Sequence, residues 1–429
     1  MAILEVKRLR LAEKKLRIVL KPWVIFLLIM AVGMYLRFYG IEYVESFEWD
    51  QVRDSWVVRN ILMGKYALLG PRTGIGHFHL PPLYYYFLAP FFYIWKLDPA
   101  ALNYFNMLMN VVNFVIIYKV TKNIFNSKAG LFVSLIYAVS HYLIGINRVP
   151  WNVTLMPGVA VLIFYAITQI YKERYKWVFV AWALSGFYFN LHFTAVFISL
   201  IVLVSLLGVK DKAKVAKYSL LSLPLYFVWL IPNIIYFIQG GDDVLKFQDF
   251  WNVYYIGLHF RFMLHRLSFA LVQFDSILYY PVFKLLKFVL PTIFGIWIVF
   301  FEKDAWKRLL GYLISLWFII PLIGFTLYGG PLSEYYFLYN AVMVIYVFWY
   351  LQEKLLQTRF KKIFIILLLM FWGTYIYQNT KDLWIKPTDG GFRAQRDYVK
   401  DQLAKGGSIS FSETDIRSYL FTIWGGDNK

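Results

Sequence analysis

The chain has 429 residues, of which 60% are hydrophobic, 21% aromatic and only 16% charged. Soluble domains are roughly 45–50% apolar and about 25% charged, so this chain has too few polar residues to cover a water-exposed surface. The formal net charge of +19 suggests either a phosphate-rich partner or the basic cytoplasmic loops of a membrane protein. The absence of cysteine excludes disulfides, thiolate catalysis and cysteine-ligated zinc.

Apolar runs along the chain predict an all-α polytopic membrane protein, because each transmembrane helix needs about 20 apolar residues. The basic segment 1–21 precedes the first run. No small-residue cleavage site follows Leu36, so we expect an uncleaved first span rather than a signal peptide. Eleven spans are predicted, at residues 22–40, 100–118, 129–146, 153–171, 176–191, 193–209, 217–239, 281–300, 309–328, 336–351 and 363–379.

The basic residues set the expected orientation. With the N-terminus in the cytoplasm, 24 of the 44 lysines and arginines fall in the short segments on that side, and each such segment is basic. A miscounted span would place a basic loop outside, so the charge pattern and the span count support each other. We therefore expect a multi-pass protein of the plasma (inner) membrane. Its net charge reflects the lipid bilayer as partner and not a nucleic acid.

The stretch from Pro81 to Trp95 is apolar enough to resemble a further span. It is short, begins with two prolines, contains Pro90 and is rich in tyrosine, phenylalanine and tryptophan. Aromatic amphipathic segments of this kind lie in the membrane interface. We therefore predict an external juxtamembrane helix here.

Three longer segments are expected on the extracytoplasmic side of the transmembrane domain, which covers residues 22–379. They are a first loop at 40–99, a later loop at 240–280 and a C-terminal tail at 380–429. The loop at 240–280 carries His259, Arg261, His265 and Arg266 among aromatic residues, which is consistent with another surface-lying helix. The tail is polar and mixed in charge, and we expect it to fold against the external loops.

The first external loop carries the densest group of charged side chains, directly after the first span. Asp50, Arg53 and Asp54 stand at i, i+3 and i+4 and therefore share one face of a helix, whereas Glu48 cannot point the same way. One interpretation is a solvated loop with ordinary ion pairs. The other is a carboxylate base beside an anionic lipid headgroup, since arginine binds phosphate in a bidentate manner.

The loop continues into a glycine- and proline-rich turn that carries Arg72, His77 and His79. Such a turn lets the backbone approach a ligand closely. The two histidines alternate without a recognisable metal motif, so hydrogen bonding is favoured over metal ligation.

The spacing of these residues resembles the GT-C superfamily of polyprenyl-phosphate-sugar glycosyltransferases, in the branch of the protein O-mannosyltransferases and the lipid A aminoarabinose transferases. The family's bacterial pattern D-E-x-R, with a second arginine six residues on, is similar to Asp50-Gln51-Val52-Arg53 and Arg59. The family's P-P-L segment looks like Pro81-Pro82-Leu83. A family pair of arginine and aspartate in the second external loop is similar to Arg148 and Asn152.

The resemblance implies transfer of a sugar, with inversion, from a polyprenyl-monophosphate donor to an acceptor hydroxyl on a lipid, glycan or protein. In this reading Asp50 is the catalytic base. Gln51 and Asn152 stand where metal-using members have carboxylates, so no cofactor is required, although Glu48 leaves a divalent cation open. The substrate-binding candidates implied beside Asp50 are Glu48, Gln51, Arg53, Arg59, Arg72, His77, His79, Arg148, Asn152, His192 and Tyr336.

Two of these candidates have simpler explanations. His192 lies at the junction of the fifth and sixth spans, where a histidine that satisfies a helix end is common. Tyr336 lies at the start of the tenth span, where an interfacial tyrosine belt explains it equally well.

A secondary transporter or flippase of a lipid-linked or anionic substrate is the alternative function. It predicts ionisable residues near the middle of the spans, whereas the charged cluster here lies at the external surface. A structural membrane protein without activity is a third alternative. No P-loop or dinucleotide glycine motif occurs in the sequence, which disfavours a nucleotide-sugar donor.

Overall fold

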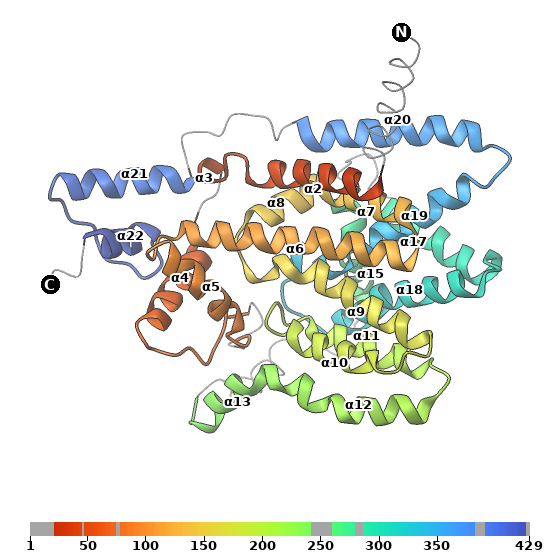
Figure 1. The fold of residues 1–429 in the computed structure, drawn as a ribbon, viewed down its shortest axis with the longest axis horizontal. Coiled ribbons are helices and arrows are strands. Elements are labelled where there is room, and N and C mark those ends of the chain that lie inside the picture. Colours follow the sequence, from red (N-terminus) through yellow and green to blue (C-terminus); the bar gives the residue numbers. More distant parts are fainter. Residues whose placement is uncertain are drawn as a thin grey trace, which may run out of the picture.

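The computed structural model describes residues 21–44, 47–73, 78–241, 260–278, 286–381 and 391–425, and these are almost entirely helical. Figure 1 shows a bundle in which α2, α6 and α20 run along the long axis. The elements are α2 (Pro22–Phe38), α3 (Ile41–Val44), α4 (Trp49–Leu62), α5 (Leu83–Ile94), α6 (Ala100–Ile124), α7 (Ser127–Val139), α8 (His141–Arg148), η1 (Asn152–Leu155), α9 (Met156–Tyr171), α10 (Trp177–Tyr188), α11 (Ala195–Leu207), α12 (Lys212–Phe227), η2 (Val228–Leu230), α13 (Ile231–Ile238), α15 (Phe260–Ala270), α16 (Val272–Leu278), α17 (Leu286–Ile296), η5 (Trp297–Phe301), α18 (Ala305–Thr326), η6 (Glu334–Asn340), α19 (Ala341–Leu355), α20 (Lys361–Thr380), α21 (Gly391–Ala404) and α22 (Ile416–Gly425).

The all-α membrane architecture predicted from the sequence is confirmed. Six described helices are long and apolar enough to cross a membrane, and the bent pair α7–α8 forms a seventh candidate. Each of the other predicted spans also contains a helix, but α10, α11, α17 with η5, and α19 are shorter than about 20 residues. The total of eleven crossings therefore stays a prediction.

The segment that resembles a further span forms α5, a helix of 12 residues. At a rise of 1.5 Å per residue a helix of this length cannot cross about 30 Å of hydrocarbon. Its predicted place at the membrane surface is consistent with this length.

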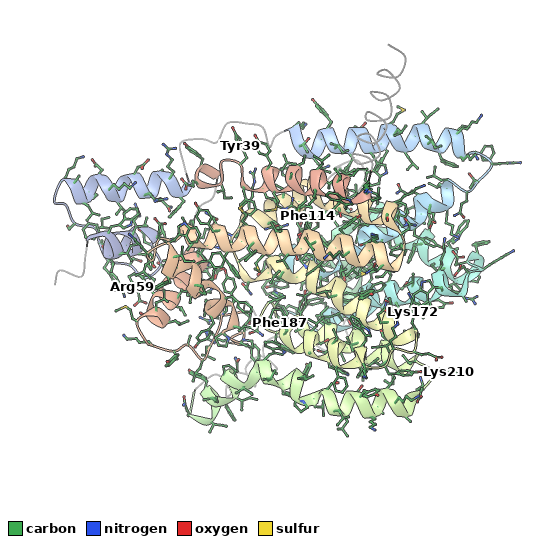
Figure 2. The ribbon with its side chains drawn as sticks, in the orientation of Figure 1. Tyr39, Arg59, Phe114, Lys172, Phe187 and Lys210 are labelled. Atoms are coloured by element: carbon green, nitrogen blue, oxygen red, sulfur yellow. The ribbon has the colours of Figure 1, made fainter. Side chains whose placement is uncertain are left out.

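The two ends of the bundle differ in character. Figure 2 shows Lys172 and Lys210 at one end of the bundle, and Arg59 at the opposite end. The helices α3, α4, α5, α21 and α22 gather at the end that carries Arg59 (Figure 1). Basic loops at one end and the charged loop at the other are the arrangement that the positive-inside pattern predicts; which end faces the cytoplasm stays a prediction.

The third predicted span is broken at Ser140, where α7 and α8 meet at an angle of 63°. Arg37 of α2, completely buried, donates to the carbonyls of Tyr137 and Ala138 at the end of α7, at 2.7 and 3.0 Å. A cation is favourable at a helix C-terminus, where carbonyl groups lack partners. Arg37 is thus an ionisable residue inside the first span, and its bonds hold the end of α7 at the break of the third span.

One face of α6 carries a row of buried asparagines at i, i+3, i+7 and i+10, a spacing that places them on one stripe of a helix. The Nδ2 of Asn106 donates to the carbonyl of Asn147 at 2.7 Å, and the Nδ2 of Asn113 donates to the carbonyl of Thr154 at 2.6 Å. These bonds attach the segment 147–154 to α6 at both of its ends. The four members of the row are Asn103, Asn106, Asn110 and Asn113.

Candidate functional site

Helix α4 begins with a reciprocal capping box formed by Glu48 and Gln51. The backbone N–H of Glu48 donates to Oε1 of Gln51 at 3.1 Å, and the Glu48 side chain accepts from the backbone of Gln51 in return. Glutamine and glutamate serve equally well at this helix position. The structure therefore gives both predicted substrate-binding residues a part in starting the helix that carries Asp50.

The predicted face of Asp50, Arg53 and Asp54 forms on α4. Arg53 donates from Nη1 to Oδ1 of Asp50 at 2.7 Å, and from Nη2 and Nε to Oδ1 of Asp54 at 2.7 and 3.0 Å. The Asp50 side chain is 40% exposed, whereas that of Asp54 is 2% exposed. One arginine therefore holds a buried carboxylate on one side and an accessible carboxylate on the other.

Asp54 and Tyr85 form the buried floor of this cluster. Burial raises the pKa of Asp54 to about 6, against the opposing attraction of Arg53 and a hydrogen bond from Tyr85 of α5. Sequence reasoning placed Asp54 on the right face but did not include Asp54 or Tyr85 among the site residues. The desolvation of Asp54 depends on α5, which comes from a different part of the chain.

Tyr335 of η6 brings a distant segment to this cluster. Burial, the neighbouring Tyr336 and the charge of Asp50 together raise the pKa of Tyr335. The Tyr335 ring also lies 4.9 Å from that of Trp151 and 5.7 Å from that of His192. The expected site region at the start of the tenth span thus lies within electrostatic reach of Asp50 through Tyr335.

His192 and Tyr336 occupy buried positions behind Tyr335. Their ring centroids are 5.0 Å apart, and Tyr336 also meets Phe193 edge-on. Nδ1 of His192 accepts the backbone N–H of Thr194 at 3.3 Å, and burial lowers the pKa of His192 to about 3. The ring is therefore neutral at physiological pH, and it accepts a backbone hydrogen bond at the start of α11. This contact corresponds to the helix-end role, the simpler of the two explanations given for His192.

Arg148 and Asn152 lie in the segment that α6 holds at both ends. Arg148 donates from Nη2 to the carbonyl of Leu36 at 2.8 Å, and its Nε has no hydrogen-bond partner among the described residues. Asn152 donates from Nδ2 to the carbonyl of Leu191 at 2.6 Å. Asn152 therefore links this segment to the junction that carries His192, a role that an aspartate could not fill as a donor.

Arg59, Arg72 and the histidines are placed at varying distances from the cluster. The guanidinium of Arg59 lies over the ring of Trp56, on the side of α4 that meets the C-terminal tail. Arg72 and His79 pair as an isolated antiparallel bridge in a short hairpin. His77 lies outside the described residues.

Arg266 of α15 is a candidate that sequence reasoning did not include. It is 6% exposed, its Nε lacks a hydrogen-bond partner and it forms no ion pair within the described ranges. Tyr328 lies within electrostatic reach of both Arg266 and Tyr335. A buried guanidinium without a carboxylate is costly, and this is the arrangement expected of a site that takes an anionic ligand.

A narrow apolar crevice with a volume of about 10 Å³ lies beside the cluster, between α5, α6, η1 and the end of α10. Tyr84, Trp151 and Asn152 contribute to its wall. The Tyr84 hydroxyl and the Trp151 indole N–H are buried and have no partner in the described parts of the chain. The charges of Asp54 and Asp50 act on Tyr84, so the crevice opens next to the charged cluster.

The described residues contain no group of three or more histidine, aspartate or glutamate side chains placed to hold a metal ion. Near Asp50, the Gln51 oxygen is used in the capping box and Oδ1 of Asp50 in the bond to Arg53. Arg53 is the charged group that joins the two carboxylates of this cluster.

Comparison with known proteins agrees with this architecture. Residues 79–236, less than half of the chain, match the family described as dolichyl-phosphate-mannose-protein mannosyltransferase. The matched segment begins after α4, so the Asp50 cluster rests on the motif resemblance and on the geometry. No curated protein sequence is similar enough to count as a relative.

Two solved proteins share the fold. ArnT from Cupriavidus metallidurans, in a structure bound to undecaprenyl phosphate, is 12% identical with a TM-score of 0.54, over 89% of this chain and 64% of that protein. The oligosaccharyltransferase of Archaeoglobus fulgidus, in a complex with zinc and sulfate, is 13% identical with a TM-score of 0.55, over 93% of this chain and 57% of that protein. The chain thus spans less than two thirds of the length of either. It has the fold of these two proteins, which is the GT-C fold that the resemblance implied.

Proposed function

We propose that this GT-C membrane protein is an inverting glycosyltransferase that moves a sugar from a polyprenyl-monophosphate donor to an acceptor hydroxyl on the extracytoplasmic face. The observation that carries the proposal is the Asp50–Arg53–Asp54 cluster, which lies beside Tyr335 at one end of an apolar bundle. Support for a lipid-phosphate donor also comes from the undecaprenyl phosphate bound to ArnT, which has the same fold.

In the proposed step Asp50 is the general base. Its Oδ1 accepts from Arg53, whereas Oδ2 has no partner among the described residues and the side chain is 40% exposed. The acceptor oxygen bonds to the anomeric carbon as its proton passes to Asp50. The bond from that carbon to the phosphate oxygen breaks, and the oxygen keeps the electron pair. A single displacement of this kind inverts the anomeric configuration.

The departing lipid phosphate gains negative charge, so preorganised cations stabilise the transition state. Arg53 is fixed between two carboxylates and serves chiefly to orient Asp50. Arg266 and Arg148 have guanidinium nitrogens without partners within the described ranges, and we assign the phosphate to them. We place the first isoprene units of the donor along the apolar crevice that Tyr84 and Trp151 line, whose side chains must move apart to admit them.

The proposed step uses no metal ion. Arginine supplies the charge that a divalent cation supplies in other phosphate chemistry. Oδ1 of Asp50 and Oε1 of Gln51 are already engaged, and the proposed step uses Oδ2 of Asp50 as the base. We therefore expect exhaustive treatment with a chelator to leave the transfer rate unchanged. A rate that falls with chelator and returns with Mn²⁺ or Mg²⁺ would contradict this part of the proposal.

The experiment that tests the function is a screen of the purified protein in lipid nanodiscs with polyprenyl-phosphate sugars labelled in the sugar. Transfer or slow hydrolysis that releases polyprenyl phosphate supports the proposal. A wild-type protein that binds none of the lipid-phosphate sugars contradicts it. Movement of the intact donor across the bilayer without cleavage would instead favour the transporter or flippase.

A further inference from the structure

The C-terminal helix α22 packs against α4, the helix that carries Asp50, and α21 packs against α22 and against the segment that precedes α4. The two tail helices form one apolar core with α4. This core joins residues of α4, α5 and the start of α6 to residues of the tail that are far away in the sequence. Figure 1 shows both tail helices at the end of the bundle where α3, α4 and α5 lie. The tail residues that are completely or almost completely buried there are Phe392, Val399, Ile416, Tyr419 and Leu420.

Aromatic contacts connect the tail to the start and to the middle of α4. The ring of Phe392 lies 4.2 Å from that of Phe47, which directly precedes the capping box of α4. In the middle of α4, the ring of Trp56 is met edge-on by the ring of Tyr419, with 4.9 Å between the ring centroids. Offset and edge-on aromatic pairs of this kind are specific in geometry as well as apolar.

Polar contacts fix the tail to the neighbouring segments. Arg396 donates from Nη2 to Asp98 at 3.0 Å, and its Nη1 lies 3.7 Å from Glu42. The hydroxyl of Tyr419 donates to the carbonyl of Leu97 at 3.0 Å. The tail is therefore bonded both before α4, at Glu42, and after α5, at the turn into α6.

Helix α4 depends on such support because of its composition. It has 14 residues, and Asp54 is the one charged side chain of this helix that is buried. A helix of this length has marginal stability on its own. Its apolar residues Val52 and Val58 are completely buried in the core that the tail completes. Loss of the tail would expose one side of α4 while the other side carries the arginine and both carboxylates.

We infer that α21 and α22 act as a brace that positions α4, and with it Asp50 and Arg53, in the site. Phe392, Arg396 and Tyr419 are then positioning residues, and the tail is not an independent domain. The inference deepens the proposed function, and its catalytic arm rests on that function. Its structural arm does not, since the packing of α4 can be measured without any substrate.

The structural arm uses the absence of cysteine in the natural chain. A cysteine at Val52, which is completely buried, reports on the packing of α4 through its reaction with a maleimide. We expect slow labelling in the Val52→Cys protein and at least a tenfold faster rate when Phe392→Ala or Tyr419→Ala is added. Tyr398→Ala is the matched control, because Tyr398 is 45% exposed on the same tail helix and should leave the labelling slow.

The catalytic arm compares turnover with substrate affinity in the full-length protein. We expect Phe392→Ala to lower kcat at least tenfold with little change in donor KM, and the conservative Phe392→Leu to recover most of the rate. Elution of the variant as a single folded species shows that the bundle is intact. Unchanged labelling at residue 52 in both tail variants would overturn the brace, whether or not transfer activity is found. Faster labelling with an unchanged kcat would overturn its role in positioning the site.

Discussion

Arg53 bonds the buried carboxylate of Asp54 through both Nε and Nη2, at 3.0 and 2.7 Å. The remaining terminal nitrogen, Nη1, reaches Asp50 at 2.7 Å. The fixed geometry of a guanidinium passes the orientation of one partner to the other. The buried carboxylate therefore sets the direction in which the exposed carboxylate is held.

We expect the decrease of kcat at acidic pH, the acid limb of the pH profile, to reflect protonation of Asp54. Its pKa is raised to about 6, so below that pH the neutral carboxyl loses its ionic bond to Arg53 and Asp50 is released. We expect kcat to fall as the pH drops through 6. Asp54→Asn should lower kcat and remove this limb. A limb that persists unchanged in the Asn variant would show that another group titrates.

The same shift predicts the pH dependence of stability. The pKa of Asp54 in the folded protein lies above its ordinary value of 3.8, so the folded state binds more protons than the unfolded state between pH 4 and 6. The Asp54 contribution to the free energy of unfolding therefore declines as the pH rises through this window and is constant above it. Thermal melting in detergent, compared between the natural chain and Asp54→Asn, measures the difference.

The assigned phosphate arginines should act on donor affinity. Arg266→Ala removes a buried cation whose Nε has no partner among the described residues, and Arg148→Ala removes one that also bonds Leu36. We expect either variant to raise the donor KM at least tenfold, and only Arg148→Ala to lower the melting temperature as well. Arg359→Ala, an exposed arginine elsewhere in the chain, controls for net charge. Unchanged donor affinity in both variants would contradict the assignment.

The asparagine row should position the segment that carries Arg148. Asn106→Leu leaves the carbonyl of Asn147 without its donor, at a cost of about 1–3 kcal/mol for a buried acceptor. We expect a lower melting temperature and a higher donor KM. Asn103→Leu is the matched control, because Asn103 lies on the same face but forms no hydrogen bond with the described residues. Equal changes of melting temperature and donor KM in Asn106→Leu and Asn103→Leu would show that the loss of a polar side chain, and not the loss of the bond to Asn147, causes the effect.

The predicted topology can be tested with single cysteines, because the chain has none. A cysteine at Asn123, at the end of α6, should resist an impermeant thiol reagent in intact cells. A cysteine at Tyr66, which is 83% exposed in the first loop, should react. Labelling at residue 123 would overturn the orientation.

The sequence was sufficient for the elements that depend on local pattern. Apolar runs predicted where the helices lie, and the i, i+3, i+4 spacing predicted that Asp50, Arg53 and Asp54 share a face. Contacts between distant segments had no such signal. The fold brings Tyr335 within electrostatic reach of Asp50, although the two residues are far apart in the sequence. Arg266 is distinguished by its burial, which the surrounding sequence does not predict.

The capping box and the tail show a second kind of limit. Gln51 looked like a missing carboxylate in a catalytic motif, whereas in the structure it completes a helix start that glutamine serves as well as glutamate. The apolar residues of the tail show a helical period, but the period does not identify the partner surface on α4. That surface is formed by side chains from three other segments.

The most direct test of the proposed chemistry compares the natural chain with Asp50→Asn on a labelled polyprenyl-phosphate sugar. Because a positioned general base contributes roughly 10²–10⁴-fold to the rate, we expect Asp50→Asn to bind the donor with unchanged affinity and to release polyprenyl phosphate at least 100-fold more slowly. Release by Asp50→Asn at the rate of the natural chain would contradict the assignment of Asp50 as the base, and with it the central claim.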